Sequence, residues 1–172
     1  AQLSAEKAIT PSLKLLPGGN LQAQLQAGQL GPMSGEVSWQ YGDGEPWLQG
    51  TLAVESQQGW ESLSGQASAR VLQDAQVAPE LILLAEGSGL EVTLAGSDVT
   101  ALQGGVQVVY GSDQWLRGQL ALAPQSTPGA LTGTLQANAQ DNHDLTPDLT
   151  VQAGSSAQAE VVANDLTGLT GN

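Results

Sequence analysis

The sequence predicts an all-β fold in which tandem five-strand repeats form one long, curled, mainly antiparallel sheet. Three observations predict it. Apolar and polar residues alternate with a period of two, turn-forming residues separate the alternating runs, and the whole pattern recurs after about 68 residues. Of the 172 residues, 40% are hydrophobic, so the chain has enough apolar surface to fold.

The alternation is plainest in residues 21–27, where Leu and Ala occupy the odd positions and Gln occupies the even ones. A helix would scatter these glutamines around its circumference, whereas a strand places them all on one face. The first repeat predicts strands at 13–16, 21–27, 33–41, 47–55 and 63–71. The second predicts strands at 81–85, 90–95, 102–110, 115–122 and 131–139. Turn sequences rich in Gly and Pro lie between the strands.

Aromatic residues mark the repeat as clearly as the aliphatic ones do. Trp47 recurs as Trp115 in the same sequence context. Tyr41 likewise recurs as Tyr110, in a chain where only 3% of the residues are aromatic. The chain therefore divides into repeat 1 at 13–80, repeat 2 at 81–148 and the start of repeat 3 at 149–172, within one continuous sheet. Because the third copy stops early, we interpret the chain as a fragment of a longer protein.

Two polar stretches that contain Pro, 72–80 and 140–148, follow the fifth strand of each repeat. Five strands of an antiparallel meander would leave the chain on the side opposite its start. Each stretch is therefore expected to cross the mouth of the curled sheet, so that the next repeat begins on the same side as the one before it. Nine extended residues reach about 30 Å, which is long enough for such a crossing.

Each strand has an aliphatic face and a face of Gln, Ser, Thr and Glu. Six glycines share the aliphatic face: Gly35, Gly50, Gly65, Gly104, Gly118 and Gly133. Because Gly weakens a strand unless a bend or a close approach needs it, we expect the sheet to coil around this face and make it concave. Trp39 and Tyr41 share the aliphatic face by parity, whereas Trp47 and Trp115 have the opposite parity to their neighbours and are expected outside.

Charge and composition exclude several classes of function. The net charge of −13 repels nucleic-acid backbones, so no nucleic-acid partner is expected. The absence of Cys excludes thiolate zinc sites and Cys nucleophiles. The single histidine, His143, lies in a polar stretch that lacks the EF-hand pattern, and no phosphate-binding loop or nucleophile elbow occurs. We therefore expect no enzymatic activity, no catalytic residue, no metal site and no cofactor.

The five-strand units and their crossing linkers resemble the repeating β-groove of bridge-like lipid-transfer proteins, whose bacterial members are the AsmA-like proteins, including TamB. Three strand runs are similar to the TamB C-terminal region: Leu48-Gln-Gly-Thr-Leu52, Leu116-Arg-Gly-Gln-Leu120 and Leu131-Thr-Gly-Thr-Leu135. The resemblance implies a segment of an envelope-spanning hydrophobic groove in the periplasm. Such a groove shields phospholipid acyl chains for transport between membranes or assists outer-membrane biogenesis. It further implies a membrane anchor, and contacts with an outer-membrane barrel protein, through parts outside this chain.

On this interpretation the aliphatic face lines the groove and contacts phospholipid or other acyl chains. The residues expected there are Leu21, Leu25, Val37, Leu52, Val54, Leu90, Val92, Leu94, Val106, Val108, Leu120, Leu122 and Leu135. A second hypothesis is a structural or adhesive tandem-repeat surface protein, in which the same strands pack into a closed core. An exposed apolar face on a folded protein usually indicates a ligand or a partner, so the two hypotheses differ in whether this face is open or covered.

Overall fold

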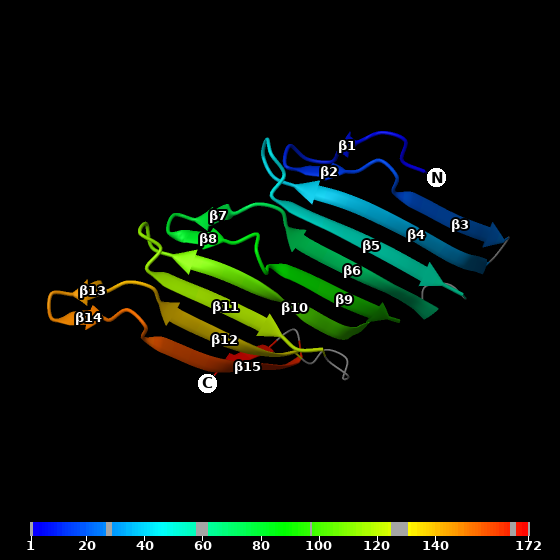
Figure 1. The fold of residues 1–172 in the computed structure, drawn as a ribbon. Coiled ribbons are helices and arrows are strands. Elements are labelled where there is room, and N and C mark those ends of the chain that lie inside the picture. The colour runs from blue at the N-terminus through cyan, green and yellow to red at the C-terminus, as the bar shows by residue number, and fades with distance from the viewer. Residues whose placement is uncertain are drawn as a thin grey trace.

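The computed structural model describes residues 2–26, 29–57, 62–96, 98–124, 131–165 and 168–171. These residues form one open antiparallel sheet of 14 strands and a separate two-stranded sheet, β13–β14 (Figure 1). The strands are β1 (Lys7–Ala8), β2 (Leu13–Leu15), β3 (Asn20–Gln26), β4 (Gln29–Tyr41), β5 (Leu48–Ser56), β6 (Leu63–Val71), β7 (Ala75–Ala78), β8 (Leu81–Leu83), β9 (Gly89–Ala95), β10 (Asp98–Tyr110), β11 (Leu116–Leu122), β12 (Leu131–Ala139), β13 (His143–Thr146), β14 (Leu149–Val151), β15 (Ser156–Asp165) and β16 (Gly168–Gly171). The predicted fold class, all-β with one large antiparallel sheet that is not closed into a barrel, is confirmed. In the described ranges no helix is long and apolar enough to cross a membrane.

Two of the predicted strands in each repeat are halves of one interrupted strand. The first part of β4 pairs with β3, and residues 39–41 of the same strand pair with β2. In the second repeat, β10 pairs first with β9 and then, through residues 108–110, with β8. Because β2 and β3 lie along a single neighbour, each repeat contributes four full-length strands to the sheet.

The polar stretches between repeats stay at one end of the sheet, so the expected crossing linkers are wrong. Residues 75–78 form β7, which pairs with β8, and residues 143–146 form β13, which pairs with β14. On either side of the first stretch, β6 and β9 are adjacent antiparallel strands. An even number of full-length strands returns the chain to the end from which it started, so no crossing is needed. Hairpins β1–β2, β7–β8 and β13–β14 therefore lie along one edge, which we call the hairpin rim (Figure 1).

Hydrogen bonds at the hairpin rim recur from repeat to repeat. The N–H of Gly42 donates to the Ser12 carbonyl at 2.8 Å, and the N–H of Gly111 donates to the Glu80 carbonyl at 2.9 Å. The carboxylate of Asp74 accepts from the N–H of Ala85 at 2.8 Å. One repeat later, the side-chain oxygen of Asn142 accepts from the N–H of Ala153 at the same distance. The sequence repeat is thus also a repeat of local structure.

Cross-strand register separates the two faces of the sheet across the repeats. Residues paired directly across antiparallel strands point to the same face. One such row on the aliphatic face consists of Leu21, Gly35, Val54, Gly65 and Leu94. A row on the opposite face consists of Glu36, Ala53, Gln66 and Thr93. The alternation seen in the sequence therefore becomes one aliphatic face and one polar face that continue from strand to strand.

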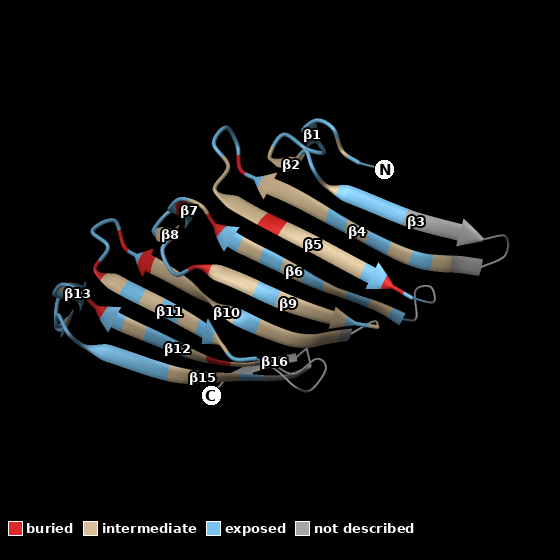
Figure 2. Ribbon diagram, turned by 45° about the vertical axis from the view of Figure 1, so that its right-hand side comes forward, coloured by how far each residue is buried: buried red, intermediate tan, exposed pale blue. Residues whose placement is uncertain are grey.

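The sheet is a single layer with little interior. No side chain of the described residues has less than 2% of its surface exposed. The buried apolar residues are Val71, Ala75, Leu84, Val109, Trp115 and Ala139. All six lie at or next to the hairpin rim, where the short hairpins meet the ends of the long strands (Figure 2). Elsewhere the aliphatic face is only partly buried.

Trp115, which strand parity places outside the sheet, is buried, with 6% of its surface exposed. Its indole stacks on the ring of His143, with centroids 4.2 Å apart and an angle of 2° between the planes. Trp47 lies edge-on to Tyr41, with centroids 5.7 Å apart. Parity fails for both tryptophans because each precedes its strand and lies in a rim loop, where side chains no longer alternate.

Replacing His143 by alanine is expected to lower the free energy of unfolding by about 1 kcal/mol, the usual contribution of a stacked ring pair. The physical reason is the loss of the ring that covers Trp115. Urea unfolding of the two proteins measures the difference. His143→Phe serves as the matched control because it keeps an aromatic ring and should retain most of the stability. An equal loss in both variants would contradict a stacking contribution.

Candidate functional site

The candidate site is the aliphatic face of the sheet, where the structure gathers the predicted lining residues. Val37 pairs directly with Leu52, and in the second repeat Val106 pairs with Leu120. Leu120 pairs in turn with Leu135, so the row continues into β12. The backbone of Leu25 belongs to β3, but its side chain lies outside the described residues. That these side chains contact lipid stays a prediction.

This face is open to its surroundings. Leu21 and Leu135 expose 52% and 43% of their surface. The remaining described lining residues are half-buried: Val37, Leu52, Val54, Leu90, Val92, Leu94, Val106, Val108, Leu120 and Leu122. Half-burial of aliphatic side chains on a sheet reflects contact with neighbours on the same face, because no second layer of the described chain covers them. A continuous apolar surface is therefore available to a ligand or a partner.

Glycines on this face make room for large neighbours. Gly50 pairs directly with Trp39, whose ring occupies the space in which a Cβ of residue 50 would lie. Gly118 pairs with Val108, and a Cβ there would approach Cγ2 of Val108 to 2.9 Å. At these two pairs the larger side chain occupies the space that the glycine leaves open on the face. This packing role accounts for these glycines without the concave bend that the sequence analysis expects.

An apolar hollow of about 190 Å³ lies at the N-terminal end of the aliphatic face. Leu3, Leu15, Leu21 and Val37 line it. The segment that carries Leu3 is held beside the sheet by two backbone hydrogen bonds of 2.9 Å, one with the carbonyl of Gly19 and one with the N–H of Gly18. The hollow is the place where a described segment partly covers the aliphatic face, and its chemistry suits a hydrocarbon group.

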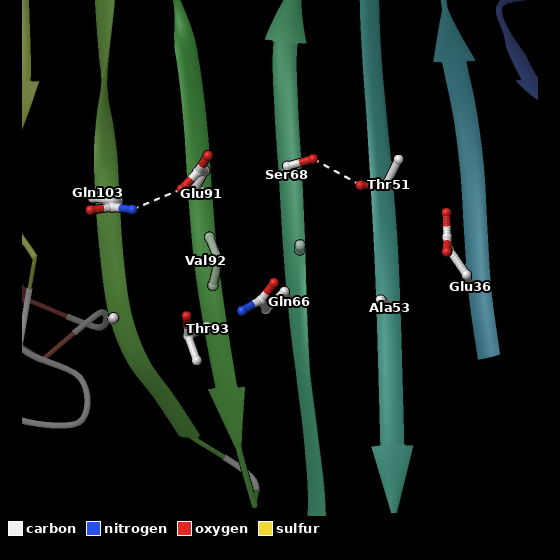
Figure 3. A pocket seen from close by; sticks show the side chains of 11 residues that line it. Glu36, Thr51, Ala53, Gln66, Ser68, Glu91, Val92, Thr93 and Gln103 are labelled. Carbon is white, nitrogen blue, oxygen red and sulfur yellow. Dashed lines mark hydrogen bonds between the residues drawn. The ribbon is translucent and has the colours of Figure 1, made fainter. Parts of the chain in front are cut away.

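The polar face carries hollows that the sequence did not predict. One, of about 420 Å³, spans β4, β5, β6, β9 and β10 (Figure 3). Two side-chain pairs are hydrogen-bonded within it: the hydroxyls of Thr51 and Ser68 at 2.8 Å, and the amide of Gln103, which donates to Glu91 at 2.7 Å. A second hollow, of about 270 Å³, lies nearby between β3, β4 and β5. Period-two alternation assigns residues to a face but carries no signal for where that face is hollowed.

The hollow of about 420 Å³ lacks the geometry of an acid–base pair. Its two carboxylates, Glu36 and Glu91, come from strands three positions apart in the sheet, about 14 Å at the usual strand spacing. Figure 3 shows them at opposite sides, with Thr51 and Ser68 between them. Paired glycosidase carboxylates lie about 5 to 9.5 Å apart. In the described part of the chain, no three His, Cys, Asp or Glu side chains gather in a way that could hold a metal ion.

The two faces thus differ in what they offer. The polar face presents hydroxyl, amide and carboxylate groups, among them the hydrogen-bonded pairs Thr51–Ser68 and Gln103–Glu91, whereas the aliphatic face presents uncovered hydrocarbon. The function of the chain has to be argued from this contrast, because comparison with protein-family models, with curated proteins and with solved structures gave no match.

Proposed function

We propose that this chain is a segment of an envelope-spanning hydrophobic surface that shields phospholipid acyl chains for transport between membranes or assists outer-membrane biogenesis. The observation that supports it is the aliphatic face, uncovered by any described layer and continuous from β3 to β12. Apolar surface left in water costs about 25 cal/mol per Å². An acyl chain laid on this face removes water from both hydrocarbon surfaces at once.

Three features favour an acyl chain as the occupant. Where Gly50 and Gly118 lie directly across from Trp39 and Val108, the larger side chain occupies the space above the glycine. This shallow relief suits a thin, flexible chain better than a bulky aromatic group. Most Gln, Ser, Thr and Glu side chains of the strands point to the opposite face, so the aliphatic face offers few polar contacts that would select a polar ligand. With only four Lys and Arg residues in the chain, a phosphate headgroup gains little here, and binding would act through the tails.

The proposed setting is the periplasm, within the cell envelope, where acyl chains must cross an aqueous layer. A membrane anchor, and contacts with an outer-membrane barrel protein, would come from parts outside this chain. The competing hypothesis, a structural or adhesive repeat protein with a closed core, requires a second layer over the aliphatic face. The described residues supply only the segment around Leu3 as cover, so this hypothesis needs a covering layer from outside the described residues.

Photo-crosslinking in cells tests the proposal. A photoreactive amino acid at position 52 or 120, both on the aliphatic face, is expected to form adducts with phospholipid, detectable by mass spectrometry of the purified protein. The matched controls are positions 51 and 119, one residue away on the polar face, where we expect adducts to be at least about tenfold fewer because side chains one residue apart point to opposite faces. Absence of lipid adducts at both aliphatic positions would contradict the proposal.

A further inference from the structure

Each hairpin of the hairpin rim exposes a large aliphatic side chain at the same position of the repeat, and the third hairpin also exposes Leu149. Ile9, Val77 and Leu145 expose 54%, 48% and 51% of their surface. They follow one another at intervals of about 68 residues, the period of the chain. The local sequences share a proline and a leucine: Ile9-Thr-Pro-Ser-Leu13, Val77-Ala-Pro-Glu-Leu81 and Leu145-Thr-Pro-Asp-Leu149.

A β-bulge produces this exposure in every copy. The pairing of β7 with β8 shifts between Gln76 and Ala78, so that Val77 is the extra residue. The pairing of β13 with β14 shifts in the same way around Leu145. In the first hairpin, the N–H groups of Ile9 and Thr10 both donate to the carbonyl of Leu13, at 2.8 and 3.2 Å, so two residues face one as in a bulge. Bulges change the direction of a side chain. The recurrence of this arrangement in the three hairpins indicates that the outward aliphatic residue is a regular part of the repeat.

The three side chains form a regular row. Successive hairpins are separated by the four full-length strands of one repeat, so they lie about 19 Å apart at the usual strand spacing. Single exposed aliphatic residues are normal on protein surfaces and carry no argument alone. Three such side chains at the same register position, along the strand ends that form the hairpin rim, match a partner that runs along this rim.

The hairpin rim is also strongly acidic, which restricts the chemistry of the partner. Ten exposed carboxylates lie in its hairpins and loops: Glu6, Asp43, Glu45, Asp74, Glu80, Glu86, Asp113, Asp141, Asp144 and Asp148. The rim hairpins contain two lysines, Lys7 and Lys14, and Lys14 is already paired with Glu6 at 3.1 Å. Arg70 and Arg117 lie in β6 and β11 close to the same strand ends, so the ten carboxylates still outnumber the positive charges. A second copy of the chain or an anionic lipid surface would bring like charge against this edge and be repelled.

From this row and its charge we infer that the hairpin rim docks a basic protein segment that carries aliphatic side chains. Ile9, Val77 and Leu145 supply the apolar contacts, one from each hairpin, and the surrounding carboxylates attract Lys and Arg of the partner. Charge complementarity of this kind speeds encounter and selects the partner, while desolvated apolar anchors slow its release. This surface is separate from the aliphatic face proposed to hold lipid, so either proposal can fail without the other.

A synthetic peptide of about 14 alternating leucines and lysines is a suitable probe, because its extended length covers the roughly 38 Å between the first and third hairpins. Fluorescence anisotropy measures its affinity for the whole chain. Combining Ile9→Ser, Val77→Ser and Leu145→Ser is expected to weaken binding at least about tenfold. These side chains are half-exposed, so the variant should fold like the parent and bind a fluorescent fatty acid unchanged.

The control variant combines Leu21→Ser and Leu135→Ser, which changes similarly exposed residues on the aliphatic face, and it should bind the peptide as the parent does. A peptide of alternating serines and lysines should bind the parent more weakly than the leucine peptide. The inference is overturned if the triple variant binds the leucine peptide as tightly as the parent, or if the control variant loses as much affinity. It is also overturned if the three rim residues prove to mediate self-association or binding to phosphatidylcholine vesicles instead.

Discussion

Gly50→Ala is expected to lower the free energy of unfolding by about 3 kcal/mol, the upper range for overpacking by a single methyl group. The added Cβ would overlap the ring of Trp39 and lie 2.7 Å from the carbonyl oxygen of Ser68. Neither group can move aside without disturbing the sheet, because the carbonyl belongs to the neighbouring strand β6 and the ring already lies over β5. Thermal and urea unfolding of the variant and the parent measure the loss.

Gly89→Ala is the matched control for this change. Gly89 also lies in a strand, but the nearest atom to an added Cβ is the carbonyl oxygen of Ala69 at 3.5 Å, an ordinary contact. We expect its unfolding free energy to change by less than about 0.5 kcal/mol, the usual range for changes away from a strained site. In a Trp39→Ala background the cost of Gly50→Ala should fall, because the ring accounts for the closest contacts. Similar costs at Gly50 and Gly89 would contradict the packing of Trp39 over Gly50.

A double substitution, Leu52→Glu with Leu120→Glu, is expected to weaken binding of a fluorescent fatty acid at least about tenfold. Both residues lie in the middle of rows on the aliphatic face, with Val37 and Val106 as neighbours across the strand. A carboxylate there must either lose its water when an acyl chain binds or keep the chain away, and burying an unpaired charge is costly. Because both leucines are only half-buried, circular dichroism should show that the sheet persists.

The polar-face variant, Thr51→Glu with Gln119→Glu, adds the same two charges one residue away. Its fatty-acid affinity should stay within about twofold of the parent, because residues 51 and 119 point to the opposite face. Equal weakening in both variants would indicate a general charge effect and contradict binding at the aliphatic face. If the parent itself shows no saturable binding, the shielding proposal fails, and the closed, structural repeat protein becomes the better hypothesis.

Local patterns predict the strands of this protein well, because the signal for a strand lies within the strand. The predicted strands at 63–71 and 131–139 have the same bounds as β6 and β12, and the other long strands of the two full repeats begin and end within a few residues of the prediction. The division of the candidate lining residues onto one face also follows from alternation, since Leu21 and Leu94 share a row through Gly35, Val54 and Gly65. The sequence missed the short strands β1, β7 and β13, each only two to four residues long. For β14, β15 and β16 it predicted only the start of a third repeat at 149–172, without strand bounds.

Pairing between strands was the first point at which the sequence prediction failed. Residues 13–16 and 21–27 each show a strand pattern, and nothing local indicates that both lie beside β4. Counting them as separate strands gives an odd number of strands in each repeat, and the odd number is what predicted the crossing linkers. β3 pairs with β4 as a local hairpin, but β2 reaches the same strand through residues far along the chain, Leu13 with Tyr41 and Leu15 with Trp39. Only the assembled sheet therefore reveals the even count.

The sequence by itself determined that this protein is a repeated antiparallel sheet with an aliphatic face and a polar face, because period-two alternation acts residue by residue along each strand. Only the tertiary structure decided that no layer of the described residues covers the aliphatic face, that the polar face is hollowed around Glu36 and Glu91, and that Trp115 is buried under His143. These features depend on how strands and hairpins approach one another in space. Their distances are set by hydrogen-bond partners and side-chain volumes contributed from different parts of the chain, which no single stretch of sequence contains.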